Sequence, residues 1–168
     1  MLSFDMRAVE SKAVVVDDTL PANDSVWQQH DPIPSEPLHV TGRLSSAGSG
    51  RFYWHGKVEG DIVLPCRRCL TDATMHVEDD QHVIYAEAGS DEADDPDVQL
   101  LDERSNIIDL RPAIREQWIL NAPSYAVCKE ECKGLCPNCG KNLNEGPCDC
   151  AESPDSRWDA LRRVKTSH

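Results

Sequence analysis

The sequence is poor in aromatic residues and has no long apolar segment. Aromatic side chains make up 5% of the 168 residues. No run of 18 or more apolar residues is present, so we expect no membrane-spanning helix and no membrane partner. The first residues lack a basic stretch followed by an apolar one, so we expect no secretory signal. These absences predict a cytoplasmic protein of about one domain with a modest core.

Lysine and arginine are missing from residues 78–103, which contain eleven of the 30 acidic residues. The rest of the chain has 19 acidic and 17 basic residues, so this stretch accounts for most of the net charge of −13. Such a composition is typical of a solvated, flexible loop, and we therefore predict an acidic loop at 78–103. The alternative is a surface that attracts a basic partner. In either case the stretch would repel a nucleic-acid backbone.

Alternating apolar residues predict three consecutive strands, at residues 38–44, 52–64 and 75–85. Together they predict an antiparallel β-meander, a partly closed sheet, with a Cys-x-x-Cys turn at the tip of its second hairpin. Residues 13–16 are a further strand candidate. The segment 17–37 is rich in turn residues and is expected to loop over the surface.

A helix is predicted after the acidic stretch. Asp109 is a good N-cap residue, and the chain should leave the helix before Pro123. Leu110, Ile114 and Trp118 lie at helical spacing and form an apolar stripe that can pack on the sheet. The fold class expected from these elements is α+β.

The chain is predicted to divide into a body and a tail. Residues 1–122 form the mixed α+β body, and residues 123–168 form a cysteine-rich module that docks on it. No apolar periodicity is present between residues 128 and 150. Ser153 and Pro154 then predict the start of a short C-terminal helix.

Cysteine is the residue type that carries most information. Cytoplasmic thiols stay reduced, so eight cysteines indicate metal binding and not a disulfide framework. Zinc binds four thiolates in a tetrahedron, and a short turn with a cysteine at each end supplies two of them. Pro137 and Gly140 give one Cys-x-x-Cys the composition of such a turn. The eight candidate metal ligands are Cys66, Cys69, Cys128, Cys132, Cys136, Cys139, Cys148 and Cys150.

We predict two structural Zn²⁺ sites of four thiolates each. The first, Cys66/Cys69/Cys128/Cys132, would fasten the tail to the sheet, and the second, Cys136/Cys139/Cys148/Cys150, would fold the tail itself. The same residues would also fit one metal ion and four spare thiols, so the number of ions stays open at this point. Eight thiolates without a nearby His/Glu pair favour closed sites over catalytic ones, which keep a coordination position open.

Catalytic alternatives fit the sequence less well. A redox Cys-x-x-Cys stands at a helix N-terminus, whereas Cys66 and Cys69 link two predicted strands. His76-x-Glu78 resembles one element of the zinc deaminases, but it follows the cysteines and should lie on a strand. Histidines such as His55 are scattered and are interpreted as polar surface residues. We therefore expect no catalytic residues, no enzyme activity and no small-molecule substrate.

Two motifs resemble those of a known family. The Cys66-Arg67-Arg68-Cys69-Leu70 hairpin resembles the C-x-R-C-L hairpin of the YceD family, the large ribosomal RNA subunit accumulation proteins. The segments 128–144 and 155–161 are similar to that family's C-terminal cysteine signature and closing helix. The resemblance extends over roughly residues 38–165 and is to the zinc-motif-containing branch, since another branch lacks most of the tail cysteines.

The resemblance implies a bacterial ribosome-biogenesis factor that supports accumulation of large-subunit ribosomal RNA. Because the chain is acidic, we expect it to act by binding a ribosomal protein or an assembly factor. Contact with ribosomal RNA would be local, through Arg67, Arg68, Lys129, Lys133 or the basic residues after 155. The alternatives are a nucleic-acid-binding zinc ribbon, which would need a basic or aromatic face, and a thiol redox protein.

Overall fold

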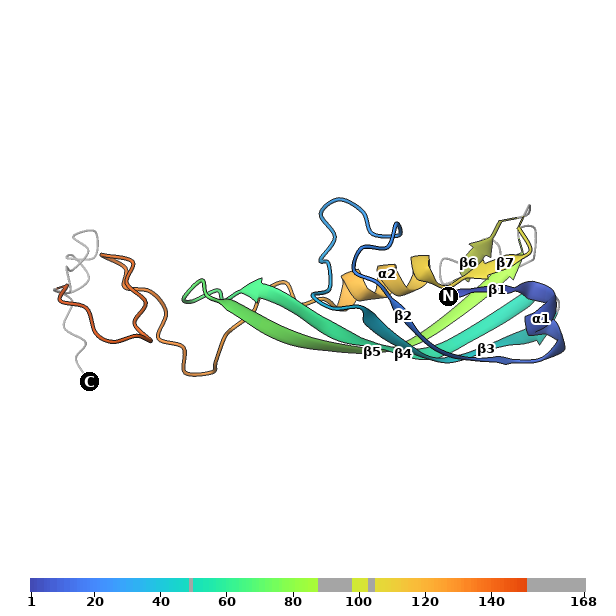
Figure 1. Ribbon diagram of the computed structural model, residues 1–168, viewed down its shortest axis with the longest axis horizontal. Coiled ribbons are helices and arrows are strands. Elements are labelled where there is room, and N and C mark those ends of the chain that lie inside the picture. The colour runs from blue at the N-terminus through green and yellow to red at the C-terminus, as the bar shows by residue number, and fades with distance from the viewer. Residues whose placement is uncertain (49, 88–97, 103–104, 151–168) are drawn as a thin grey trace, which may run out of the picture.

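The computed structural model describes residues 1–48, 50–87, 98–102 and 105–150. A five-stranded sheet with the order β2-β3-β4-β5-β6 runs along the long axis of the molecule (Figure 1). Its strands are β2 (Val14–Leu20), β3 (Leu38–Gly48), β4 (Arg51–Pro65), β5 (Asp72–Glu87) and β6 (Val98–Leu101). Strands β2 to β5 pair in antiparallel fashion, whereas β6 lies parallel to β5.

The predicted meander is confirmed as β3-β4-β5, and the strand candidate at residues 13–16 is the start of β2. One strand of the sheet was not predicted: the four-residue β6 pairs parallel to β5, and so short a strand leaves little periodicity to detect. One expectation was wrong. The acidic stretch is not one loop, because residues 78–87 belong to β5 and 98–101 to β6.

The physical reason for this error is the two-sided environment of β5. Val77, Val83 and Tyr85 are buried, while the acidic side chains Glu78 and Asp80 lie between them on the solvent side. A strand with one charged face therefore has the composition of a loop while it keeps its alternating pattern.

One face of the sheet is covered and contains the core. Figure 1 shows α2, the strand pair β1–β7 and the segment 21–37 on this side of the sheet. The remaining elements are β1 (Ser3–Asp5), α1 (Met6–Ser11), β7 (Ile107–Asp109) and α2 (Arg111–Asn121). Ile114 and Trp118 of α2 are buried in the same core as Leu44, Phe52 and Trp54 of the sheet. Among the described residues, no element covers the opposite face (Figure 1).

A close approach of two backbones lies at the centre of this core. Gly42 of β3 and Gly56 of β4 are directly opposite each other, and the ring of Trp54 lies over both. A Cβ atom added at Gly56 would lie 2.2 Å from Trp54 Cζ2 and 2.6 Å from the Thr41 carbonyl oxygen. The absence of a side chain at Gly56 therefore makes room for the ring of Trp54, as a glycine on a strand's inner face suggests.

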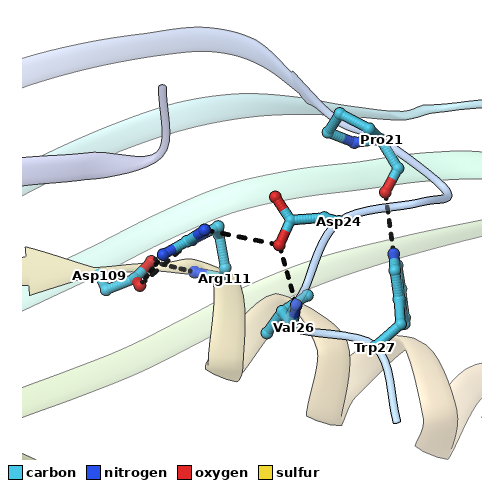
Figure 2. Close-up of polar contacts among 6 residues, drawn as sticks. All are labelled: Pro21, Asp24, Val26, Trp27, Asp109 and Arg111. Atoms are coloured by element: carbon cyan, nitrogen blue, oxygen red, sulfur yellow. Dashed lines mark hydrogen bonds and ion pairs between the residues drawn. The ribbon is translucent and has the colours of Figure 1, made fainter. Parts of the chain in front are cut away.

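The segment after β2 is tied to α2 by polar contacts (Figure 2). The Arg111 guanidinium donates to both carboxylate oxygens of Asp109, at 2.7–3.1 Å, and lies 3.5 Å from Asp24 Oδ1. Asp24 Oδ1 also accepts the backbone N–H of Val26 at 2.9 Å, and Trp27 Nε1 donates to the Pro21 carbonyl at 2.9 Å. Charge-assisted contacts of this kind hold the segment in one conformation although it is irregular.

Farther along, the same segment contacts the middle of α2. Arg115 makes two hydrogen bonds to the Asp31 carboxylate, at 2.6 and 2.8 Å, and Trp118 Nε1 donates to the Pro32 carbonyl at 2.6 Å. The N-cap of α2 differs from the prediction, because Leu110 occupies it and Asp109 lies in β7. The helix ends at Asn121, which confirms the predicted end before Pro123.

Within the described part of the chain, no helix combines the length and the apolar character needed to cross a bilayer. The division into a body of residues 1–122 and a tail of residues 123–168 stays a prediction. The predicted C-terminal helix after Ser153 lies outside the described residues.

Candidate metal centres

The eight cysteines lie in two groups of four. We call Cys66, Cys69, Cys128 and Cys132 the hinge cluster, and Cys136, Cys139, Cys148 and Cys150 the tail cluster. In each group the four sulfur atoms lie within 4.8 Å of one another. The two groups are the same two sets of four cysteines that were predicted from the sequence. The hinge cluster lies at the tip of the β4–β5 hairpin, and the tail containing the other cluster continues beyond that tip (Figure 1).

The Cys-x-x-Cys turn of the hinge cluster is held by three hydrogen bonds. The N–H of Cys66 donates to the Thr71 carbonyl at 2.8 Å, and the N–H of Leu70 donates back to the Cys66 carbonyl at 2.9 Å. The N–H of Arg68 points at Cys66 Sγ, 3.4 Å away. Leu70 has a φ of 61°, in the left-handed region that a non-glycine residue seldom adopts. The hydrogen bonds of the turn therefore hold its conformation, since leucine at position 70 does not itself favour a positive φ.

The tail cluster contains a second turn with the same three bonds. Cys136 N–H donates to the Lys141 carbonyl at 2.8 Å, Gly140 N–H donates to the Cys136 carbonyl at 2.9 Å, and Asn138 N–H lies 3.4 Å from Cys136 Sγ. Gly140, with a φ of 73°, takes the place of Leu70. Two segments of different sequence thus adopt one hydrogen-bonded turn, each presenting a pair of thiols.

The spacing of the sulfur atoms in the hinge cluster is compatible with a tetrahedral metal ion. Cys66 Sγ lies 3.9 Å from Cys132 Sγ, and Cys69 Sγ lies 3.5 Å from Cys128 Sγ. Four sulfurs at about 2.3 Å from one ion are separated by about 3.8 Å. A disulfide would instead need about 2.0 Å between sulfurs. All eight cysteines are free, so both clusters could hold a metal ion.

Neighbouring N–H groups favour the thiolate form at one cysteine of each turn. The backbone N–H of Cys128, together with that of Arg68, lowers the pKa of the Cys66 thiol to about 6 against the effect of burial. The N–H groups of Cys139 and Asn138 likewise lower the pKa of Cys136 to about 6. Cys66 and Cys136 are therefore favoured as thiolates at neutral pH, the form in which a cysteine binds a metal ion.

Backbone and side-chain hydrogen bonds join the tail to the hairpin tip at the hinge cluster. Arg67 N–H donates to the Ala126 carbonyl at 2.9 Å, and Leu135 N–H donates to the Arg68 carbonyl at 3.1 Å. The Arg68 guanidinium donates to the carbonyls of Glu130 and Cys132, at 2.9 and 3.2 Å. Arg68, one of the residues suggested for RNA contact, thus has its Nη1 engaged within the protein. Arg67 lies 4.3 Å from the centre of the Tyr125 ring.

Two residues around the hinge cluster were not identified from the sequence. Asn144 Nδ2 donates to Cys132 Sγ at 3.3 Å, and Asn144 Oδ1 accepts the N–H of Lys133 at 3.0 Å. The side chain of Asn144 lowers the pKa of the Cys132 thiol. Thr71 Oγ1 lies 2.9 Å from Cys69 Sγ. In the sequence, the position of Asn144 and Thr71 shortly after a Cys-x-x-Cys pair was the feature that could have pointed to them.

The part of the sequence that contains both cysteine clusters matches a known protein family. Residues 54–165, about two thirds of the chain, match the family described as "Large ribosomal RNA subunit accumulation protein YceD". The chain belongs to the YceD family. The stretch shared with the YceD family begins within β4 and includes both cysteine clusters.

Individual relatives cover different parts of the chain. The uncharacterized protein YlbN of Bacillus subtilis is 24% identical over 140 residues, which are 83% of this chain and 80% of YlbN. The uncharacterized protein Rv2926c of Mycobacterium tuberculosis is 33% identical over 128 residues, 74% of this chain and 60% of that protein. The large ribosomal RNA subunit accumulation protein YCED homolog 1, chloroplastic, of Arabidopsis thaliana is 37% identical over 59 residues, 34% of this chain and 18% of the plant protein. None of the solved structures matches the chain.

Proposed function

We propose that this protein is a ribosome-biogenesis factor that supports accumulation of large-subunit ribosomal RNA by binding and not by catalysis. The observation that carries the proposal is membership in the YceD family, whose description names this process. The Arabidopsis relative has the same process in its name. The proposed place of action is the cytoplasm, where bacterial ribosomes assemble.

We propose further that the hinge cluster and the tail cluster each bind one structural Zn²⁺. Soft thiolate ligands in groups of four favour zinc over magnesium, calcium or manganese. The repeated turn, with an N–H directed at the first sulfur of each pair, supports this assignment. Four thiolates leave no open coordination position, so such sites would maintain the fold and would not activate a water molecule.

The charge of the molecule favours a protein partner over RNA. RNA affinity depends largely on neutralising phosphates with lysine and arginine, whereas this chain has a net charge of −13. Four thiolates around one Zn²⁺ keep a negative charge. We therefore propose that a basic ribosomal protein or assembly factor binds the acidic stretch of residues 78–103. Ribosomal RNA would be contacted at most locally, near Arg67, Lys129 and Lys133.

Deletion and complementation test the cellular function. Removing the gene from the source organism should lower the ratio of large-subunit to small-subunit ribosomal RNA, and the wild-type gene should restore it. The Cys66→Ser variant should restore it poorly, because it disrupts the joint between tail and hairpin. An unchanged ratio after deletion would contradict the proposed function.

Zinc content tests the metal assignment independently. Purified wild-type protein should contain two zinc ions per chain, and Cys66→Ser and Cys136→Ser should contain one each. One ion in all three proteins would disprove the two-site assignment without affecting the ribosomal role.

Affinity purification tests the choice of partner. Ribosomal proteins should remain bound after RNase treatment and should be lost when the acidic residues between 91 and 97 are replaced by their amides. A variant with the same number of amides placed elsewhere is the matched control. Loss of every ribosomal partner after RNase treatment would show that RNA mediates the contact.

A further inference from the structure

The bare face of the sheet carries a group of metal-binding side chains that is separate from the cysteines. His55 of β4 and His82 of β5 are directly opposite each other in the antiparallel register. Asp80 lies two residues from His82 on the same face of β5. Directly opposite side chains have Cβ atoms about 5 Å apart, so the register brings together three potential ligands that are up to 27 positions apart in the sequence. His55 is a surface residue, as expected, but it is not scattered among the histidines, because it lies beside His82.

The polar atoms of these three side chains converge. His55 Nε2 lies 3.3 Å from Asp80 Oδ1, and His82 Nε2 lies 3.9 Å from Asp80 Oδ2. The two imidazole rings are nearly parallel, with their centroids 4.2 Å apart. Ligand atoms bound to one ion at about 2.1 Å are about 3.0–3.4 Å apart, and the ligand atoms of the three side chains already lie within 4.8 Å of one another. Binding requires the two stacked rings to rotate until both nitrogen lone pairs point at one ion. The side chains are 51–70% exposed and are free to make such rotations.

Tyr53 supplies the outer contact that a metal-binding histidine normally has. Its hydroxyl oxygen lies 2.6 Å from His82 Nδ1. When Nδ1–H donates to this oxygen, the lone pair of the ring is on Nε2, the atom nearer to Asp80. Such a contact fixes the tautomer and orientation of a ligating imidazole. Tyr53 also stacks on His55, with ring centroids 6.4 Å apart, so one side chain orients both histidines.

A second group on the same face serves as a contrast. Glu59, His76 and Glu78 also lie close together. Here the Lys57 ammonium lies 2.9 Å from Glu59 and 3.0 Å from Glu78 and already forms an ion pair with each carboxylate. This group is therefore an ion-pair network and carries no metal proposal.

We propose that His55, Asp80 and His82 form a surface site for a borderline divalent transition-metal ion such as Ni²⁺ or Zn²⁺. Two imidazoles and one carboxylate suit such ions, whereas magnesium and calcium prefer oxygen ligands alone. Three protein ligands leave further coordination positions open to solvent. The site thus differs from the closed thiolate clusters, and it depends neither on them nor on the ribosomal function.

Titration of the full-length, zinc-loaded protein with Ni²⁺ tests the proposal. Calorimetry should show one additional site, and substoichiometric Ni²⁺ should broaden the imidazole NMR signals of His55 and His82 before those of the other histidines. His55→Ala and His82→Ala should each weaken binding at least about tenfold. Tyr53→Phe should weaken it about tenfold, the lower end of what is typical for loss of an outer-shell contact.

His76→Ala is the matched control, because this histidine lies on the same face but outside the site. Its affinity for Ni²⁺ should stay within about twofold of wild type. The three histidines are exposed and Tyr53→Phe removes only a hydroxyl group, so the variants are expected to fold, and an unchanged NMR spectrum of the remaining residues would establish this. Equal broadening of all histidines, or unchanged affinity in His55→Ala, would overturn the proposal.

Discussion

Disrupting one cysteine cluster should loosen one part of the molecule and leave the other intact. Two backbone N–H groups report on the two parts. Arg67 N–H donates to the Ala126 carbonyl and reports on docking of the tail at the hinge cluster. Gly140 N–H donates to the Cys136 carbonyl and reports on the turn of the tail cluster. We expect Cys66→Ser to accelerate hydrogen exchange at Arg67 alone, and Cys136→Ser to do so at Gly140 alone.

The size of the effect follows from what holds the tail. Residues 128–150, all described by the structure, bury only Cys132, Gly134 and Cys136, so apolar packing contributes little. The hydrogen bonds between tail and hairpin tip contribute about 1 kcal/mol each, roughly 4 kcal/mol together. Ordering each residue opposes them by about 1–2 kcal/mol. A structural zinc site contributes on the order of 10–16 kcal/mol and therefore dominates.

Losing the hinge site should consequently reduce protection at Arg67 by at least about 100-fold, since each 1.4 kcal/mol corresponds to a factor of ten. Exchange measured by NMR on uniformly ¹⁵N-labelled protein resolves both amides in one experiment. Unchanged protection at Arg67 in Cys66→Ser would show that packing, and not metal, holds the tail. Loss of protection at both amides in either variant would show that the two clusters form one cooperative unit.

Two further predictions concern the sheet. Gly56→Ala should lower the free energy of unfolding in urea by about 3 kcal/mol, the upper end for overpacking, because the new methyl group meets the rigid Thr41 carbonyl and the Trp54 ring. Gly60→Ala should cost less, because its methyl group meets only the end of a flexible leucine, and equal losses would refute the steric explanation. Hydrogen bonds to Asp17 and a glutamate raise the pKa of His39. Protonated His39 therefore contributes fully to the free energy of unfolding below pH 6.5, and this contribution is lost as the pH rises through the raised pKa. The melting temperature of H39Q should therefore fall below that of wild type at pH 5.5 and equal it at pH 9, and a difference independent of pH would contradict this.

The parts of the fold that depend on local periodicity were predictable. The alternation from Phe52 to Ile62 gave the inner face of β4, and the helical spacing of Ile114 and Trp118 gave the buried side of α2. The grouping of the cysteines could be predicted because short Cys-x-x-Cys turns have a fixed geometry. The prediction of an acidic loop failed at residues 78–87, because the charged face of β5 has a loop-like composition although its alternation had already indicated a strand.

The parts that depend on register were not predictable. The pairing of His55 with His82 requires the alignment of β4 with β5, and a shift of one residue would move both side chains to the other face. The binding of segment 21–37 to α2 depends likewise on contacts such as Arg115 with Asp31, which are 84 positions apart. The contact of Asn144 with Cys132 required knowledge of how the tail turns back.

The two cysteine clusters differ in how much of the chain must be in place before a metal ion can bind. The tail cluster takes all its ligands from residues 136–150, so it can be loaded as soon as this short segment has left the ribosome. The hinge cluster joins Cys69 to Cys128, 59 positions apart, and the longer loop makes its closure less favourable until α2 has packed on β5 and returned the chain to the hairpin tip. Metal should therefore enter the tail first, and occupancy of the hinge cluster would mark a chain whose sheet is complete.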